Sequence, residues 1–158
     1  MEVPSLPLDA RLIPDYQRWV ADLQLAPPNI WSYLSNHSTA GMAALFSKLF
    51  WPDLVEVEGC ILLAEQYSAE EFQAWASQFQ HDRDDIERMI NHTHVYDLFA
   101  GHGGTRTDER VWEYLGRALP ACWRCALSTV YPSRAFAFDY GSEPEDYGPT
   151  ISFWQVDR

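Results

Sequence analysis

The chain has 158 residues, and its 23 Asp and Glu residues outnumber its 11 Lys and Arg residues, which gives a formal net charge of −12 at pH 7. A disordered acidic tail is excluded, because 47% of the residues are hydrophobic and 15% are aromatic, which is enough to form a core. A folded acidic domain repels nucleic-acid phosphates and anionic membranes and attracts basic molecules. We therefore expect a basic protein partner, and no direct binding to nucleic acid or to a membrane.

A chain of this length fits one globular domain, and we expect residues 1–158 to share a single core. The opening Met-Glu-Val-Pro-Ser-Leu-Pro has neither the basic start nor the apolar stretch of a secretory signal. The densest apolar run, residues 40–50, is shorter than the roughly 20 residues that cross a bilayer. Cys60, Cys122 and Cys125 form no regular disulfide framework, so we expect reduced thiols and a cytoplasmic location.

Proline spacing and helical periodicity organise the first fifty residues. Pro4, Pro7 and Pro14 predict an extended lead-in over residues 1–14, because proline fixes φ and removes an amide donor. Beyond it, apolar residues recur at helical spacing in three stretches that are bounded by proline or by capping residues. The predicted helices cover residues 15–25 and 29–35, and a third begins at Ser38 or Thr39 and ends near residue 50.

The periodicity then changes from helical to alternating. Val55 and Val57 alternate with glutamates, and a continuous apolar run follows Gly59. This pattern predicts one strand over residues 54–64 that enters the core at a glycine bulge or bend.

A capping box opens the next helical region. Ser68 stands three residues before Glu71, so the serine oxygen can accept an early helical amide while the glutamate reaches back. Apolar residues continue at helical spacing to Ile90, which predicts either one long helix or two helices divided near Asp82.

The last third of the chain combines a helix with two strands. Residues 91–107 are predicted to be a loop with a short element near residues 95–99, and a helix is expected to begin at residues 107–109. Pro120 either bends this helix or begins a second one. Alternating apolar residues predict strands at 135–140 and 150–156, joined by an acidic hairpin loop. The predicted fold class is α+β, a single domain with helices packed on a small, mostly antiparallel sheet.

Two short motifs have the spacing of metal or redox sites. Cys122-Trp-Arg-Cys125 has the two-sulfur spacing of a redox dithiol or of half a zinc site, but no second Cys-x-x-Cys accompanies it. His92-Thr-His94 places two imidazoles on one side of an extended segment, and Asp97 could join them as a third ligand. Both motifs also fit structural roles, the cysteines as small apolar helix residues that face the core and the histidines as loop anchors. We expect no cofactor and assign no catalytic residue.

Carboxylates beside aromatic rings are the stronger functional signal. Rigid rings and acids around the closing hairpin can receive Arg or Lys side chains from a partner. A second set of acids, Asp82, Asp84, Asp85 and Glu87, lies within the predicted helical region before residue 90, where the alternative is a solvated helix face. The predicted partner-binding residues are Tyr140, Glu143, Glu145, Asp146, Tyr147 and Trp154 at the hairpin, and Asp82, Asp84 and Asp85 in the helical region.

The chain is an acidic, lysine-poor single domain that ends with the segments Ala135-Phe-Ala-Phe-Asp-Tyr and Gly148-Pro-Thr-Ile-Ser-Phe-Trp. In these features it resembles, in type, the immunity proteins of bacterial toxin–immunity systems. This resemblance implies a cognate toxin that is neutralised by stoichiometric binding through the acidic surface. Two alternatives remain. One is a small metal-dependent enzyme that uses His92 and His94, and the other is an acidic nucleic-acid mimic or adaptor that binds a different basic protein.

Overall fold

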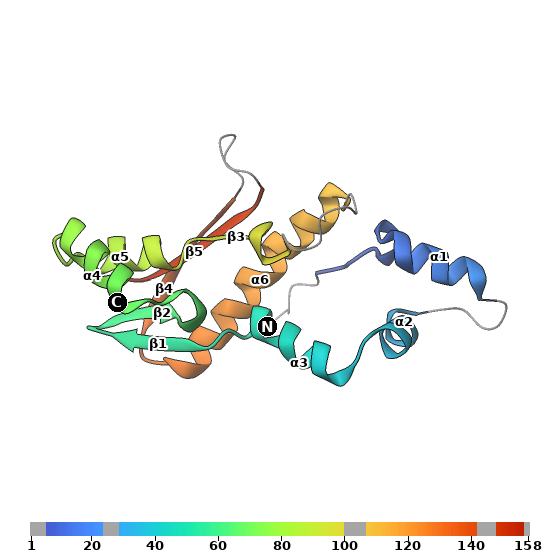
Figure 1. Cartoon of the computed structure of the whole chain (residues 1–158), viewed down its shortest axis with the longest axis horizontal. Coiled ribbons are helices and arrows are strands. Elements are labelled where there is room, and N and C mark those ends of the chain that lie inside the picture. Colours follow the sequence, from blue (N-terminus) through green and yellow to red (C-terminus); the bar gives the residue numbers. More distant parts are fainter. Residues whose placement is uncertain (1–5, 24–28, 100–106, 142–147, 157–158) are drawn as a thin grey trace.

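Helices surround two small antiparallel sheets in this computed structural model, which describes residues 6–23, 29–99, 107–141 and 148–156 (Figure 1). The α+β class and the helix-on-sheet packing predicted from the sequence are confirmed. The helices and strands are α1 (Pro14–Asp22), α2 (Ile30–His37), α3 (Ala40–Phe50), β1 (Leu54–Val57), β2 (Cys60–Leu63), α4 (Ala69–Gln78), α5 (Arg83–Ile90), β3 (Thr93–His94), α6 (Glu109–Val130), β4 (Ala135–Gly141) and β5 (Thr150–Val156).

The amino-terminal segment is more helical than predicted. A short 3-10 helix, Ala10–Leu12, interrupts the predicted extended lead-in, and Asp9 caps it by accepting the Arg11 amide. Pro14 then begins α1, because a proline at the first helical position lacks an amide that would be unpaired there in any case. Thr39, one of the two predicted starts, is the N-cap of α3, and Ser68 is the N-cap of α4 as predicted. Asp82, near which a division was one alternative, is the N-cap of α5.

The prediction of one strand over residues 54–64 is wrong, because the chain turns back on itself at residues 58–59. Glu58 and Gly59 both have positive φ, at 50° and 86°, and Val57 pairs with Cys60 across this two-residue turn. Positive φ at both central positions is the geometry that lets a two-residue loop follow the twist of the strands. Leu54–Leu63 therefore forms the β1–β2 hairpin, whose second strand is fully buried.

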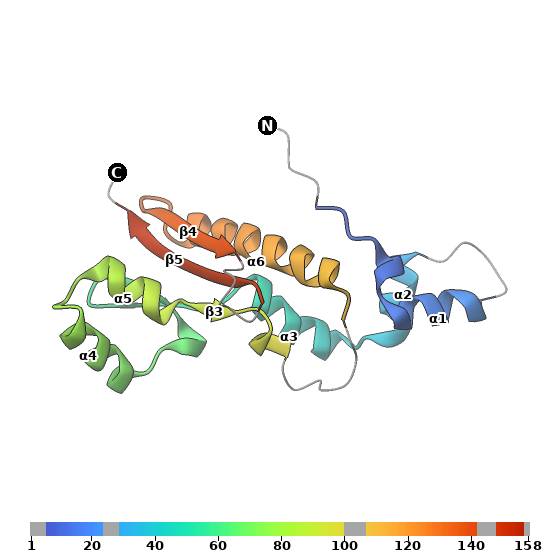
Figure 2. The same cartoon turned by 90° about the horizontal axis from the view of Figure 1, so that it is seen from above.

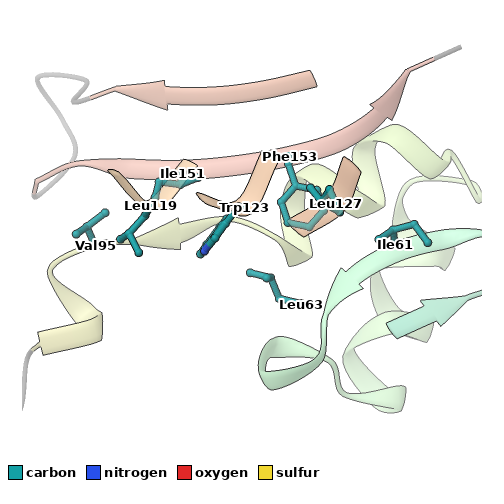
Figure 3. Close-up of a cluster of buried hydrophobic side chains, with 8 residues drawn as sticks. All are labelled: Ile61, Leu63, Val95, Leu119, Trp123, Leu127, Ile151 and Phe153. Atoms are coloured by element: carbon teal, nitrogen blue, oxygen red, sulfur yellow. The ribbon is translucent and has the colours of Figure 1, made fainter. Parts of the chain in front are cut away.

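The main core lies between α6 and the three-stranded sheet, whose strand order is β3-β5-β4. Figure 3 shows Ile151 and Phe153 of β5 directed toward Leu119, Trp123 and Leu127 of α6, with the side chains of β2 beside them. The α6 helix runs through Pro120 without interruption, so this proline neither divides it nor begins a second helix. Figure 2 shows α6 and the β4–β5 hairpin on one side of the molecule, and α4 and α5 on the other.

Two buried polar side chains, Glu87 of α5 and its C-cap residue Asn91, join the two sheets. Glu87 accepts the backbone amides of Ile61 in β2 and Gln155 in β5, each at 2.6 Å. Asn91, one helical turn later, accepts the Leu63 amide at 2.9 Å and donates to the carbonyls of Ile61 (2.9 Å) and Phe153 (3.1 Å). Both side chains are 0% exposed. This Glu87–Asn91 bridge satisfies backbone groups at strand edges that have no neighbouring strand there.

Candidate functional site

The acidic residues are concentrated in one part of the fold. Residues 56–87 contain nine Asp and Glu residues but one basic residue, Arg83. This segment forms most of the β1–β2 hairpin together with α4 and most of α5, at the end of the molecule opposite to α1 and α2 (Figure 1). Residues 1–53, by contrast, contain five acidic and three basic residues. We name the β1–α5 region, residues 54–90, the acidic end; it contains the same nine acidic residues and one further basic residue, Arg88.

Some carboxylates of the acidic end are already paired within the chain. Arg134 reaches Glu56 at 2.6 Å, and Arg83 contacts Asp84 at 3.0 Å. Glu87 is buried in the bridge between the sheets. Others remain available to a partner, since six exposed carboxylates of this end form no ion pair with any residue that the structure describes. These are Glu58, Glu65, Glu70, Glu71, Asp82 and Asp85.

The predicted helical set lies at a helix boundary. Asp82 is the N-cap of α5, and its carboxylate accepts the Asp85 amide at 3.1 Å. Asp84 and Asp85 occupy the first turn, where negative charge interacts favourably with the helix dipole. The chain therefore forms two helices divided at Asp82, which is the second of the sequence alternatives. Asp82 and Asp85 are both exposed, and Asp82 also caps the helix. Glu87, which the sequence grouped with these acids, is instead buried, because its carboxylate accepts backbone amides of both sheets.

The predicted hairpin set is described only at its two ends. Glu143, Glu145, Asp146 and Tyr147 lie outside the described residues. Tyr140 pairs with Ile151 across the strands, so its side chain lies on the sheet face that carries the core. Trp154 pairs with Ala137 and lies on the opposite face, because successive strand residues alternate between faces. The structure does not bring these two rings together.

Trp154 already has a cation against its ring. The Arg88 guanidinium carbon lies 3.4 Å from the ring centroid, and the Arg88 carbonyl accepts the Ser152 hydroxyl at 2.7 Å. A partner arginine would have to displace Arg88 to stack on the same face of this ring. Tyr140, in contrast, is 55% exposed and lines a shallow pocket with Arg117 and Arg124 of α6.

The histidine motif forms a pair, as the spacing suggested. The Nε2 atoms of His92 and His94 lie 3.3 Å apart, with the rings nearly perpendicular. Within the described ranges, no group of three or more His, Cys, Asp or Glu side chains is arranged to hold a metal ion, so Asp97 does not complete the site there. Two imidazoles alone supply half of a tetrahedral zinc site.

The cysteines are free thiols in different surroundings. Burial raises the pKa of the Cys60 thiol to about 11 and also raises that of Cys122, so neither is activated as a thiolate. Cys125 is exposed on α6, which corrects the expectation that both cysteines of the motif face the core.

An apolar surface that sequence reasoning did not assign to partner binding lies on α2 and α3. Every residue from Ala40 to Lys48 is exposed, although the helical spacing of Met42, Leu45 and Phe46 is typical of a core-facing stripe. Periodicity identifies an apolar face but not what covers it. We name as the apolar arm surface the exposed residues Ile30, Trp31, Leu34, Met42, Leu45 and Phe46.

Among the described residues, no helix is both long enough and apolar enough to cross a membrane. Comparisons with protein-family models, with curated proteins and with solved structures each find no match for this chain.

Proposed function

We propose that this protein is an immunity-type inhibitor, which binds a basic protein toxin in the cytoplasm and neutralises it through the acidic end. The proposal depends mainly on one observation: residues 56–87 contain nine acidic residues and one basic residue. These residues lie in the β1–β2 hairpin, α4 and α5, which together form one end of the fold. Clustered charge of one sign raises the rate of association with a partner of the opposite sign.

The available carboxylates support a protein partner. Glu65, Glu70 and Asp85 are exposed and unpaired within the described chain, so they can form charge-assisted hydrogen bonds without first breaking an internal ion pair. The same charge opposes direct contact with nucleic-acid phosphates. If the toxin is a nuclease, the carboxylates would occupy the site in which it normally binds the phosphates of its substrate.

The test begins with the genes that flank this one, because an immunity gene is expected beside its toxin gene. Each flanking reading frame is expressed in a bacterial host with and without this chain. One of them should arrest growth, this chain should relieve the arrest, and the two proteins should purify as a stoichiometric complex. If no flanking product is toxic, or if toxicity persists despite equal expression of this chain, the proposal is wrong.

Charge variants then locate the interface on the purified complex. The double change Glu65→Ser and Asp85→Ser should lower the association rate more than the matched pair Asp22→Ser and Glu113→Ser, which removes the same charge elsewhere on the exposed surface.

The hairpin prediction from the sequence is compared in the same assay, with Glu143, Glu145 and Asp146 all changed to Ser. Sequence reasoning predicts a loss of several orders of magnitude in affinity for this variant. If the hairpin variant weakens binding and the Glu65→Ser, Asp85→Ser variant does not, the toxin binds the hairpin, and the proposal that it binds the acidic end is wrong.

A further inference from the structure

The α3 helix packs against the core of the protein only through its carboxyl end. Trp123 of α6 donates its indole N–H to the Leu49 carbonyl at 2.7 Å, and Leu49 and Phe50 pack against the core. The nine residues before them are exposed, with Leu45 at 67%. A helix this apolar is normally covered, since large exposed apolar patches on soluble proteins mark interaction sites.

The neighbouring helices leave the surface open. Tyr16 and Trp19 of α1 pack on Tyr33 of α2, with ring centroids 5.3 and 5.4 Å apart, so α1 and α2 cover each other. Trp31, on the same helix as Tyr33, is 83% exposed. Phe46 also lines a cleft of about 420 Å³ between the start of α1 and α6, which extends the apolar surface toward the body.

The distribution of charge identifies the occupant. Residues 1–53 contain five acidic and three basic residues, whereas residues 54–158 contain 18 and eight. A basic partner would be attracted to the acidic end and would gain little electrostatic attraction from residues 1–53, which are nearly neutral. A second copy of this chain brings an identical apolar surface, and contact through α2 and α3 keeps the two acidic ends, which lie at the far end of each molecule, away from each other (Figure 1).

We infer that this protein forms a homodimer through the apolar arm surface, leaving both acidic ends free. A twofold contact is self-complementary, so each residue of the surface appears twice in the interface. Burial of apolar side chains drives the association, while the charge of −12 on each copy opposes it. The dimer should therefore tighten as salt rises, because screening weakens the repulsion.

The test is sedimentation equilibrium of the purified full chain from about 1 to 200 μM, because the dimer fraction depends on protomer concentration. The wild-type protein should be dimeric, and Leu45→Glu should raise the dimer dissociation constant by a factor of about 100 or more, since the twofold axis buries two new charges. The matched control is Val130→Glu, at a 51% exposed apolar residue of α6, which should leave the dimer unchanged. Circular dichroism checks that both variants fold.

A wild-type protein that remains monomeric over this range would overturn the inference, as would a dimer that loses affinity on Val130→Glu but not on Leu45→Glu. A monomer whose toxin binding is abolished by Leu45→Glu would likewise overturn it and assign the surface to the toxin. The salt responses separate this inference from the proposed function, since the toxin complex should weaken with salt while the homodimer strengthens.

Discussion

Substitution of Asn91 tests how the two sheets are held together. Its side chain makes one accepted and two donated hydrogen bonds with backbone groups of Ile61, Leu63 and Phe153, all in the interior. Asn91→Leu fills a similar volume but leaves three backbone groups without a partner. Asn91→Asp keeps an acceptor for the Leu63 amide and directs its second oxygen at two carbonyls.

The expected loss follows from the number of groups left unpaired. A buried polar group without a partner costs about 1 to 3 kcal/mol, so the three groups left unpaired by Asn91→Leu should lower the free energy of unfolding by about 3 to 9 kcal/mol. That is a large part of the roughly 5 to 15 kcal/mol that stabilises a typical domain. Asn91→Asp should lose as much at pH 7, because burial beside carbonyl oxygens disfavours the charged form.

The two variants differ in their response to pH. Burial raises the pKa of the introduced carboxyl above its unfolded value of about 3.9, so the folded state binds the proton more tightly. The stability of Asn91→Asp should therefore recover, relative to wild type, as pH falls from 7 toward 4, while Asn91→Leu should not recover.

Urea unfolding followed by tryptophan fluorescence measures these changes, since Trp123 is buried in the adjacent core. Asn36→Asp, at an exposed position of α2, is the matched control and should change the free energy of unfolding by less than about 0.5 kcal/mol. Equal stability of Asn91→Asp and Asn36→Asp at pH 7 would show that the bridge does not hold the sheets together.

Four further outcomes are expected. Glu87→Gln should lower the melting temperature, because both carboxylate oxygens accept backbone N–H groups and the amide nitrogen of Gln would place a donor next to one of these donors. An unchanged melting temperature would contradict this. A hydrogen bond from the Arg110 side chain lowers the pKa of Asp108, the N-cap of α6, to about 2. The contribution of the Asp108 carboxylate to folding stability is therefore present above pH 3.8 and is lost as the pH falls toward 2. Asp108→Asn keeps the cap and should flatten that part of an acid-unfolding curve. Cys125→Ser, at an exposed thiol, should shift stability by less than about 0.5 kcal/mol in urea unfolding. Metal analysis of protein purified without chelator should find no stoichiometric zinc, and one zinc per chain that is lost in His92→Ala would instead make the histidine pair part of a metal site.

Local patterns predicted most elements of the fold because those elements depend on neighbouring residues. Alternation of apolar residues located β5 over residues 150–156, and Ser68 located the start of α4. The β1–β2 hairpin was missed because its turn places Glu58, rather than Asn or Asp, at a positive φ. No local signal showed that Glu87 and Asn91 bridge the sheets, because their partners lie up to 68 residues away.

The candidate surfaces were harder to predict because they, too, depend on how residues far apart in the sequence are arranged in the fold. The acid count over residues 56–87 can be read directly from the sequence, yet only Asp82, Asp84, Asp85 and Glu87 were singled out, and Glu87 is buried. Exposure of Leu45 could not be predicted from periodicity, because a core stripe and an interface stripe have the same spacing. The faces of Tyr140 and Trp154 depend on the register between β4 and β5.

The most direct test of the central claim is the association rate between this protein and the toxic product of a flanking gene, measured by stopped-flow fluorescence at increasing salt. Binding through the acidic end predicts a stoichiometric complex whose association rate falls as salt rises and falls further in the Glu65→Ser, Asp85→Ser variant. An association rate that is independent of salt and unchanged in that variant would contradict binding through the acidic end.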